Sequence, residues 1–212
     1  IPQEEPAGQN PPDGAIINYY LSDNVNGEVL LEIIDANGKI VRRFSSLDKP
    51  YEVPPNNVPS YWLRPQQMLS AKSGSHRFVW DLHYTPLDIP PSYPIAAVYQ
   101  NTIPNPTSPW VLPGTYTVKL IVDGKVYSQS MKVKMDPNLK TSAQDLLLQH
   151  DLAYGLYTSR KTLLEKKPSS ENEKKEMDQH DRKMAGVFAV LQNTDMPPTT
   201  QAVSAAKELI KR

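Results

Sequence analysis

The chain has 212 residues, of which 23 are Lys or Arg and 23 are Asp or Glu, so its formal net charge is zero. Because nucleic-acid binding ordinarily needs a basic patch or stripe, this balance argues against a nucleic-acid partner. The absence of cysteine excludes disulfides and thiolate chemistry. No apolar run approaches the roughly 18 residues that a spanning helix needs, so no membrane span is expected.

The two parts of the chain differ in composition. Of the 21 prolines, all but Pro168, Pro197 and Pro198 lie at or before Pro137, together with most Val, Ile, Thr and Tyr runs. This composition favours β-strands with long loops, whereas the Leu, Ala, Lys and Glu that follow favour helices. We therefore expect an α+β chain with a linker over residues 1–9, a β domain over 10–137 and a helical domain over 141–212.

The first strand candidates are AIINYYL (15–21) and EVLLEIID (28–35), and the polar segment between them predicts a hairpin. Asn37-Gly38 separates the second candidate from IVRRFS (40–45). Such a dipeptide is the strongest short-range hairpin signal and predicts a type I′ turn.

A further strand is predicted over 76–84, where Phe78, Trp80 and Leu82 alternate onto one face and should be buried. The segment 113–135 predicts a second hairpin around Asp123-Gly124. Six short strands with alternating patterns indicate an antiparallel sandwich of the immunoglobulin or fibronectin type.

Two long proline-rich loops, residues 49–75 and 85–112, interrupt these strands. Loops of this length are usually functional or disordered, and their aromatic content argues against disorder. Their aromatic side chains could stack on sugar rings, or could cover the sandwich or contact a neighbouring domain. The candidate binding residues are Tyr61, Trp62, Tyr93, Tyr99 and Trp110.

Three amphipathic helices are expected after residue 141. Ser142 is the predicted N-cap of the first, with Asp145 at its third position, and Ser170 with Glu173 forms a capping box for the second. Pro197-Pro198 then precedes a shorter helix over about 199–211. The short connections predict a three-helix bundle, or a helical hairpin with a docking helix.

Several motifs resemble, in the same order, the C-terminal region of bacterial BNR-repeat, sortilin-type β-propeller proteins, which are commonly labelled glycosyl hydrolase or exo-sialidase-like. The resemblance covers nearly the whole chain and implies a bacterial periplasmic, cell-surface or secreted protein that accompanies a propeller. The segments that carry it are NPPDGAIINYYL, GEVLLEIIDANGKIVRRFSS, YWLRPQQMLSAKSGSHRFVWDLHY, PSYPIAAVY, SPWVLPGTYTVKLIVDGK and VKMDPNLKTSAQDLLLQHDL.

The β part is also similar to the Ig-like domain of flagellar hook-capping proteins. The similarity lies in the D-x-x-G-K hairpin of residues 35–39, the FVWD strand of 78–81 and the PGTY of 113–116. It implies a structural module. The propeller family's chemistry would belong to its Asp-box repeats, S-x-D-x-G-x-x-W, and no such box occurs here. No catalytic residue is therefore carried over.

The histidines and aspartates offer weaker alternatives. His150 and His180 could approach each other across a helical hairpin with Asp151 and Asp181, but no histidine pair has metal-ligand spacing, so we expect neither a metal nor a cofactor. Paired carboxylates could serve glycoside hydrolysis. Turns and exposed strand faces account for the candidates equally well, and these are Asp35, Asp81, Asp88 and Asp123.

Three functions are left open. The first is a non-catalytic accessory region whose aromatic loops pack on a β-propeller of the parent protein or on another protein partner. The second is a carbohydrate-binding module that uses the loop aromatics. In the third, the loops complete a glycosidase active site, so enzyme activity in this chain alone is not expected.

Overall fold

The structure is a computed structural model that describes residues 12–55 and 58–211. Within these ranges the chain is a mixed α+β protein, as expected, and the linker predicted for residues 1–9 lies outside them. Its strands are β1 (Ala15–Leu21), β2 (Val29–Ile34), β3 (Ile40–Ser45), β4 (Gly74–Trp80), β5 (Gly114–Val122) and β6 (Lys125–Val133). Its helices are the short 3-10 helix η1 (Ser60–Trp62), α1 (Ala143–Glu165), α2 (Glu171–Gln192) and α3 (Thr200–Ile210).

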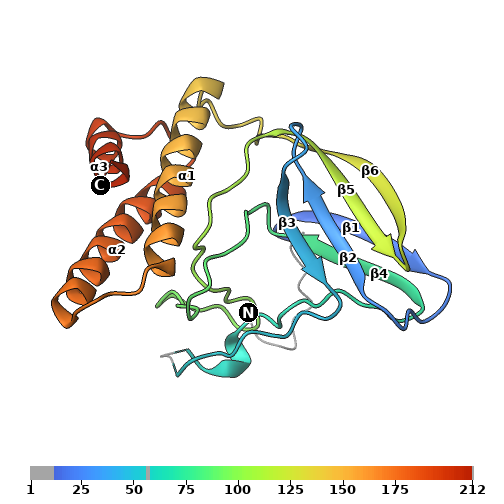
Figure 1. Cartoon of the computed structure of the whole chain (residues 1–212). Helices are drawn as coiled ribbons and strands as arrows, with labels where there is room; N and C mark the ends of the chain where they lie inside the picture. The colour runs from blue at the N-terminus through green and yellow to red at the C-terminus, as the bar shows by residue number, and fades with distance from the viewer. Residues whose placement is uncertain (1–11, 56–57, 212) are drawn as a thin grey trace.

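The strands form two antiparallel sheets (Figure 1). One has the order β3-β2-β5-β6, and the other pairs β1 with β4 from Ala15 opposite Trp80 to Leu21 opposite Gly74. The hairpin predicted between residues 15–21 and 28–35 is therefore wrong. The polar connection carries the chain from one sheet to the other, and the Val25 amide is held by the Ala71 carbonyl at 2.9 Å.

The two predicted hairpin turns differ in type. At Asn37-Gly38 only the glycine has a positive φ, 81°, and the Gly38 amide donates to the Asp35 carbonyl. The expected type I′ turn is thus wrong, and the geometry fits a type I turn followed by a left-handed glycine. Asp123 and Gly124 have φ values of 48° and 75°, which a two-residue type I′ turn requires.

Side chains from both sheets share one core. Leu31 and Ile33 of β2 and Trp80 of β4 are each 0% exposed, and the Trp80 ring lies 5.7 Å from that of Tyr116 in an edge-to-face contact. The expected burial of Phe78 and Trp80 is confirmed. Leu82 is only partly buried, because the strand ends at Trp80 and Leu82 takes a left-handed φ of 59°.

The three helices pack on one another around a second core. It includes Leu156 of α1, Phe188 of α2 and Ala206 of α3. The predicted N-caps are present, since the side chains of Ser142 and Ser170 each accept a hydrogen bond from the third helical amide. The Glu173 carboxylate accepts from the Ser169 amide instead of the Ser170 amide, so the expected capping box is shifted by one residue. Among the described residues, none of these helices has the length and apolarity to cross a bilayer.

The second long loop joins the two cores. Leu87 is 6% exposed and packs with the helical core, together with Ile89, whereas Val111 near the end of the same loop is buried in the core of the sheets. In Figure 1 this segment, drawn in green, runs between the strands and the helices. The loop is therefore ordered by apolar contacts at both of its ends.

Candidate functional site

The tips of the two long loops are held together by backbone contacts. Leu63 and Thr102 form a parallel bridge, and the Arg64 amide donates to the Thr102 carbonyl at 2.8 Å. The Thr102 side chain is itself fixed, because its hydroxyl accepts from the Val98 amide and donates to the Val98 carbonyl, both at 2.8 Å. These bonds place η1 beside residues 98–102.

The contact between the two loop tips brings three aromatic rings together at the surface. We call them the aromatic loop cluster: Tyr61, Trp62 and Tyr99. The Tyr99 ring centroid lies 6.5 Å from that of Tyr61 and 6.3 Å from that of Trp62, both in edge-to-face geometry. Tyr61 is 66% exposed and Tyr99 is 48% exposed. Three of the five aromatic residues singled out from the sequence thus meet at one surface.

Polar and apolar groups flank the cluster. The Arg64 guanidinium donates two hydrogen bonds to the Asn101 side-chain oxygen, at 3.0 and 2.6 Å. On the same loop as Tyr99, Ile95 is fully exposed and Val98 is 60% exposed. The surroundings therefore combine exposed apolar area with a polar pair in which Asn101 orients the Arg64 guanidinium.

Tyr93 belongs to a different contact between the loops. Burial and the hydroxyl of Tyr93 together raise the pKa of Tyr51 well above its usual value. Tyr51 is fixed by Gln66, whose side chain bonds both the amide and the carbonyl of Tyr51 at 2.8 Å. Tyr93 is half-buried, and its hydroxyl is buried without a hydrogen-bond partner among the described residues.

Trp110 lies against the end of β4 and the helices. Its ring centroid is 3.9 Å from that of His83, and its amide donates to the side chain of Gln192, the last residue of α2, at 2.8 Å. His83 is buried, and this burial lowers its pKa, although Asp81 opposes the effect. Trp110 thus contributes to the junction between the β part and the helical part.

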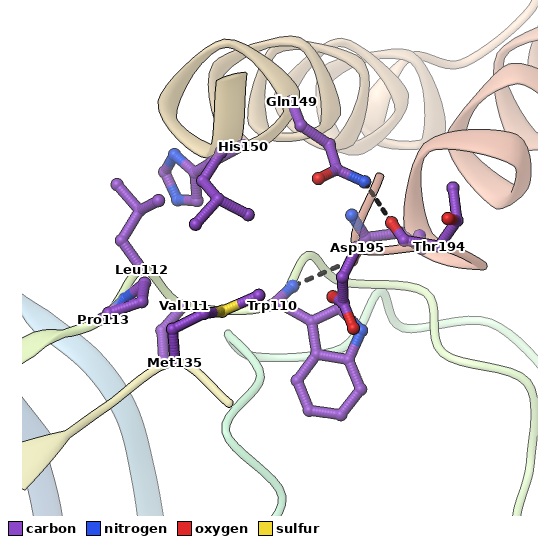
Figure 2. A pocket seen from close by; sticks show the side chains of 11 residues that line it. Trp110, Val111, Leu112, Pro113, Met135, Gln149, His150, Thr194 and Asp195 are labelled. Carbon is purple, nitrogen blue, oxygen red and sulfur yellow. Dashed lines mark hydrogen bonds between the residues drawn. The ribbon is translucent and has the colours of Figure 1, made fainter. Parts of the chain in front are cut away.

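A small cavity lies at this junction (Figure 2). Its volume of about 70 Å³ is enough for a few water molecules. The buried Gln149 side chain spans one wall and donates to the carbonyls of Leu191 and of Thr194, the latter at 2.5 Å. The other lining residues are Trp110, Val111, Leu112, Pro113, Met135, Leu146, His150, Gln192 and Asp195.

The junction contains a second aromatic group that sequence reasoning did not find. Tyr84 contacts the rings of His150 and Tyr154, and its hydroxyl lies 3.3 Å from His150 Nε2. The Lys39 ammonium donates to the Tyr154 hydroxyl at 2.5 Å. Burial lowers the pKa of His150, against the opposing effect of Asp151. These contacts hold α1 against the β part.

Three of the carboxylates considered for metal binding and for hydrolysis take part in local structural contacts. No group of three or more His, Asp or Glu side chains that could bind a metal occurs among the residues that the structure describes. Asp181 forms a two-point ion pair with Arg160, at 2.8 and 3.2 Å. Asp35 accepts amide hydrogen bonds within its turn, and Asp81 accepts one from His83. These three side chains thus stabilise a helix pair, a turn and a strand end.

Comparisons of the chain with protein-family models, with curated proteins and with solved structures give no significant match.

Proposed function

We propose that this chain is a non-catalytic accessory region that packs on another folded domain through the aromatic loop cluster. The observation that carries the proposal is the exposure of Tyr61 and Tyr99 in a cluster fixed by backbone hydrogen bonds. Tyr and Trp are enriched among the residues that dominate binding energy, and pre-ordered side chains lose little entropy on association. The exposed Ile95 and Val98 extend the apolar surface beside the cluster.

The expected partner is a β-propeller domain of the parent protein, in a periplasmic, cell-surface or secreted setting. This part of the proposal rests on the resemblance to sortilin-type propeller proteins. The distribution of the strands over two antiparallel sheets with one core supports an Ig-like or fibronectin-like sandwich, followed by a three-helix bundle. In this arrangement the sandwich is a rigid support for the loops.

The composition of the cluster favours association over chemistry. Glycoside hydrolysis needs two carboxyl groups on opposite sides of the scissile bond. The aromatic loop cluster and its polar neighbours, Arg64 and Asn101, contain none. The chain can thus contribute contacts to a neighbouring active site, but the acid and the base would belong to the partner.

The test begins with the encoding gene, in which propeller repeats are expected upstream of Ile1 in the same reading frame. That upstream domain, expressed separately, should bind this chain in isothermal titration calorimetry. Tyr61→Ala and Tyr99→Ala should each weaken binding by about 30-fold, corresponding to a hot-spot loss of about 2 kcal/mol. Tyr20→Ala is the matched control, because Tyr20 is 69% exposed on β1. An equal loss for the control would refute the assignment of the surface.

Carbohydrate binding is the second candidate. The exposed rings of Tyr61 and Tyr99 favour it, with the polar side chains of Arg64 and Asn101 on the same two loops. An aromatic face flanked by hydrogen-bonding groups is suited to a sugar ring. A glycan array separates the two functions. Glycan binding that Tyr61→Ala abolishes and Tyr20→Ala preserves would establish a carbohydrate-binding module, whereas a negative array with intact domain association supports the accessory role.

A further inference from the structure

The edge strand β6 has an open backbone edge. It pairs with β5 on one side, and no described segment pairs with it on the other. Lys125 and Lys132 are its charged residues, so the six residues from Val126 to Met131 carry no charge, proline or glycine. Val126 and Tyr127 are each 57% exposed. Long uncharged edges of this kind are templates for pairing with another strand.

Two of the other strand edges are better protected. Gln67 covers the second edge of β4, since its side chain accepts from the Val79 amide at 3.1 Å and donates to the Arg77 carbonyl at 2.9 Å. The edge strand β3 carries Arg42 and Arg43 in its centre. Within the described residues, β1 also has an open edge and carries no charged residue, so it is the competing edge for association.

The turn at Asp123-Gly124 determines which groups of β6 face outward. A two-residue turn is closed by a hydrogen-bonded pair, here Val122 opposite Lys125. Pairs alternate along an antiparallel ladder, so the odd-numbered residues of β6 bond to β5. The amides and carbonyls that point to the open edge are those of Val126, Ser128, Ser130 and Lys132.

We propose that this open edge of β6 pairs antiparallel with the same edge of a second copy of the chain, with the two-fold axis at Gln129. In this register Ser128 faces Ser130 of the other copy, and Val126 faces Lys132. All of these are outward-pointing residues, so each pair exchanges both backbone hydrogen bonds. The same residue patch serves both copies, as a two-fold interface requires.

The side chains are compatible with the same register. Tyr127 of one copy lies opposite Met131 of the other, which forms a favourable sulfur-aromatic pair and covers the exposed ring. Each lysine of β6 faces a valine, because Lys125 lies opposite Val133. No like charges are directly opposed. The two four-stranded sheets become one continuous sheet across the interface.

A cysteine cross-link tests the position of the axis, and the chain has no cysteine of its own. In Gln129→Cys the two thiols flank the axis in a non-hydrogen-bonded pair, whose Cα atoms are about 4.5 Å apart, within disulfide range. In the control Lys125→Cys the two residues are about 27 Å apart, at about 3.4 Å per residue. Mild oxidation should yield a covalent dimer for Gln129→Cys alone. Equal cross-linking of the two variants, or none, would overturn the proposal.

A charge exchange tests the pairing without a covalent link. The variant Ser128→Glu/Ser130→Glu opposes two carboxylates twice across the interface, whereas Ser128→Glu/Ser130→Lys opposes unlike charges. Light scattering coupled to size exclusion should find a dimer for the wild type and the second variant, and at least a tenfold weaker dimer for the first. Circular dichroism establishes that both are folded. A monomeric wild type would overturn the proposal, as would a dimer that Tyr20→Lys on β1 disrupts while the double-Glu variant does not.

Discussion

Replacing Asp181 by alanine tests how the helices are held together. Arg160 on α1 is 5% exposed, and its Nε and Nη2 atoms bond the two carboxylate oxygens of Asp181 on α2 at 2.8 and 3.2 Å. Asp181→Ala leaves this guanidinium buried without its counter-charge. Breaking a buried pair from one side costs about 3–5 kcal/mol, and we expect a loss of this size in the free energy of unfolding.

The reverse change should cost less. The Asp181 side chain is 24% exposed, so water can solvate its carboxylate in Arg160→Met. A loss of about 1.5–3 kcal/mol is expected, which is the net contribution of hydrogen bonds to a charged group. The double variant Arg160→Met/Asp181→Leu should lie within about 1 kcal/mol of the wild type, because apolar replacement of both partners removes the desolvation penalty.

Urea unfolding measures these differences. Far-UV circular dichroism follows α1, α2 and α3, while tryptophan fluorescence follows the β core through Trp80 and the contact between the β part and the helices through Trp110. A cost below about 1 kcal/mol for Asp181→Ala is typical of an exposed ion pair and would refute the reasoning.

Three further predictions concern single residues. Ser142→Ala removes the cap of α1 and should lower the unfolding free energy by about 1 kcal/mol in urea titration, whereas Ser142→Asp should retain it. Gln100→Gly should raise the thermal midpoint, because Gln100 is exposed at φ 53° and left-handed backbone costs other residues about 1–2 kcal/mol. The pKa of His150 is lowered in the folded state, so folding favours the neutral imidazole. The stability that His150 contributes is therefore fully present above its unfolded pKa of about 6.5, and it is lost as the pH falls through the folded pKa. His150→Gln should therefore lose less unfolding free energy than the wild type when the pH is lowered, as urea titrations at several pH values would measure. The same pH dependence in both proteins would contradict this.

Local pattern predicted local structure well in this chain. Alternation identified β1 and β3 at their observed bounds, and the side chains of Ser142 and Ser170 cap α1 and α2 as expected. The pairing of the strands could not be predicted from the local pattern. Residues 15–21 and 28–35 are close in sequence and have turn residues between them, yet β1 pairs with β4, because burying the apolar faces of both sheets in one core outweighs the proximity of neighbouring strands.

The candidate site was predictable in composition only. The loops were identified by their aromatic residues, but nothing local distinguishes Trp62, which contacts Tyr99 in the aromatic loop cluster, from Trp110, which packs on His83 and keeps 43% of its surface exposed. That difference arises from the bridge between Leu63 and Thr102 and from the bond to Gln192. The contact of Tyr84 with His150 spans 66 positions and has no signature in either segment.

The loop of residues 85–112, which packs in both cores, also constrains the order in which the chain can fold during synthesis. Leu87 emerges from the ribosome before any residue of α1, so this side chain stays unburied until the helices that enclose it have been synthesised. A helical fragment beginning near residue 141 would lack Leu87 and Ile89 and would therefore have a gap in its interior. The helical core is thus built from two separate stretches of the chain, the loop around Leu87 and the three helices that follow the sheets.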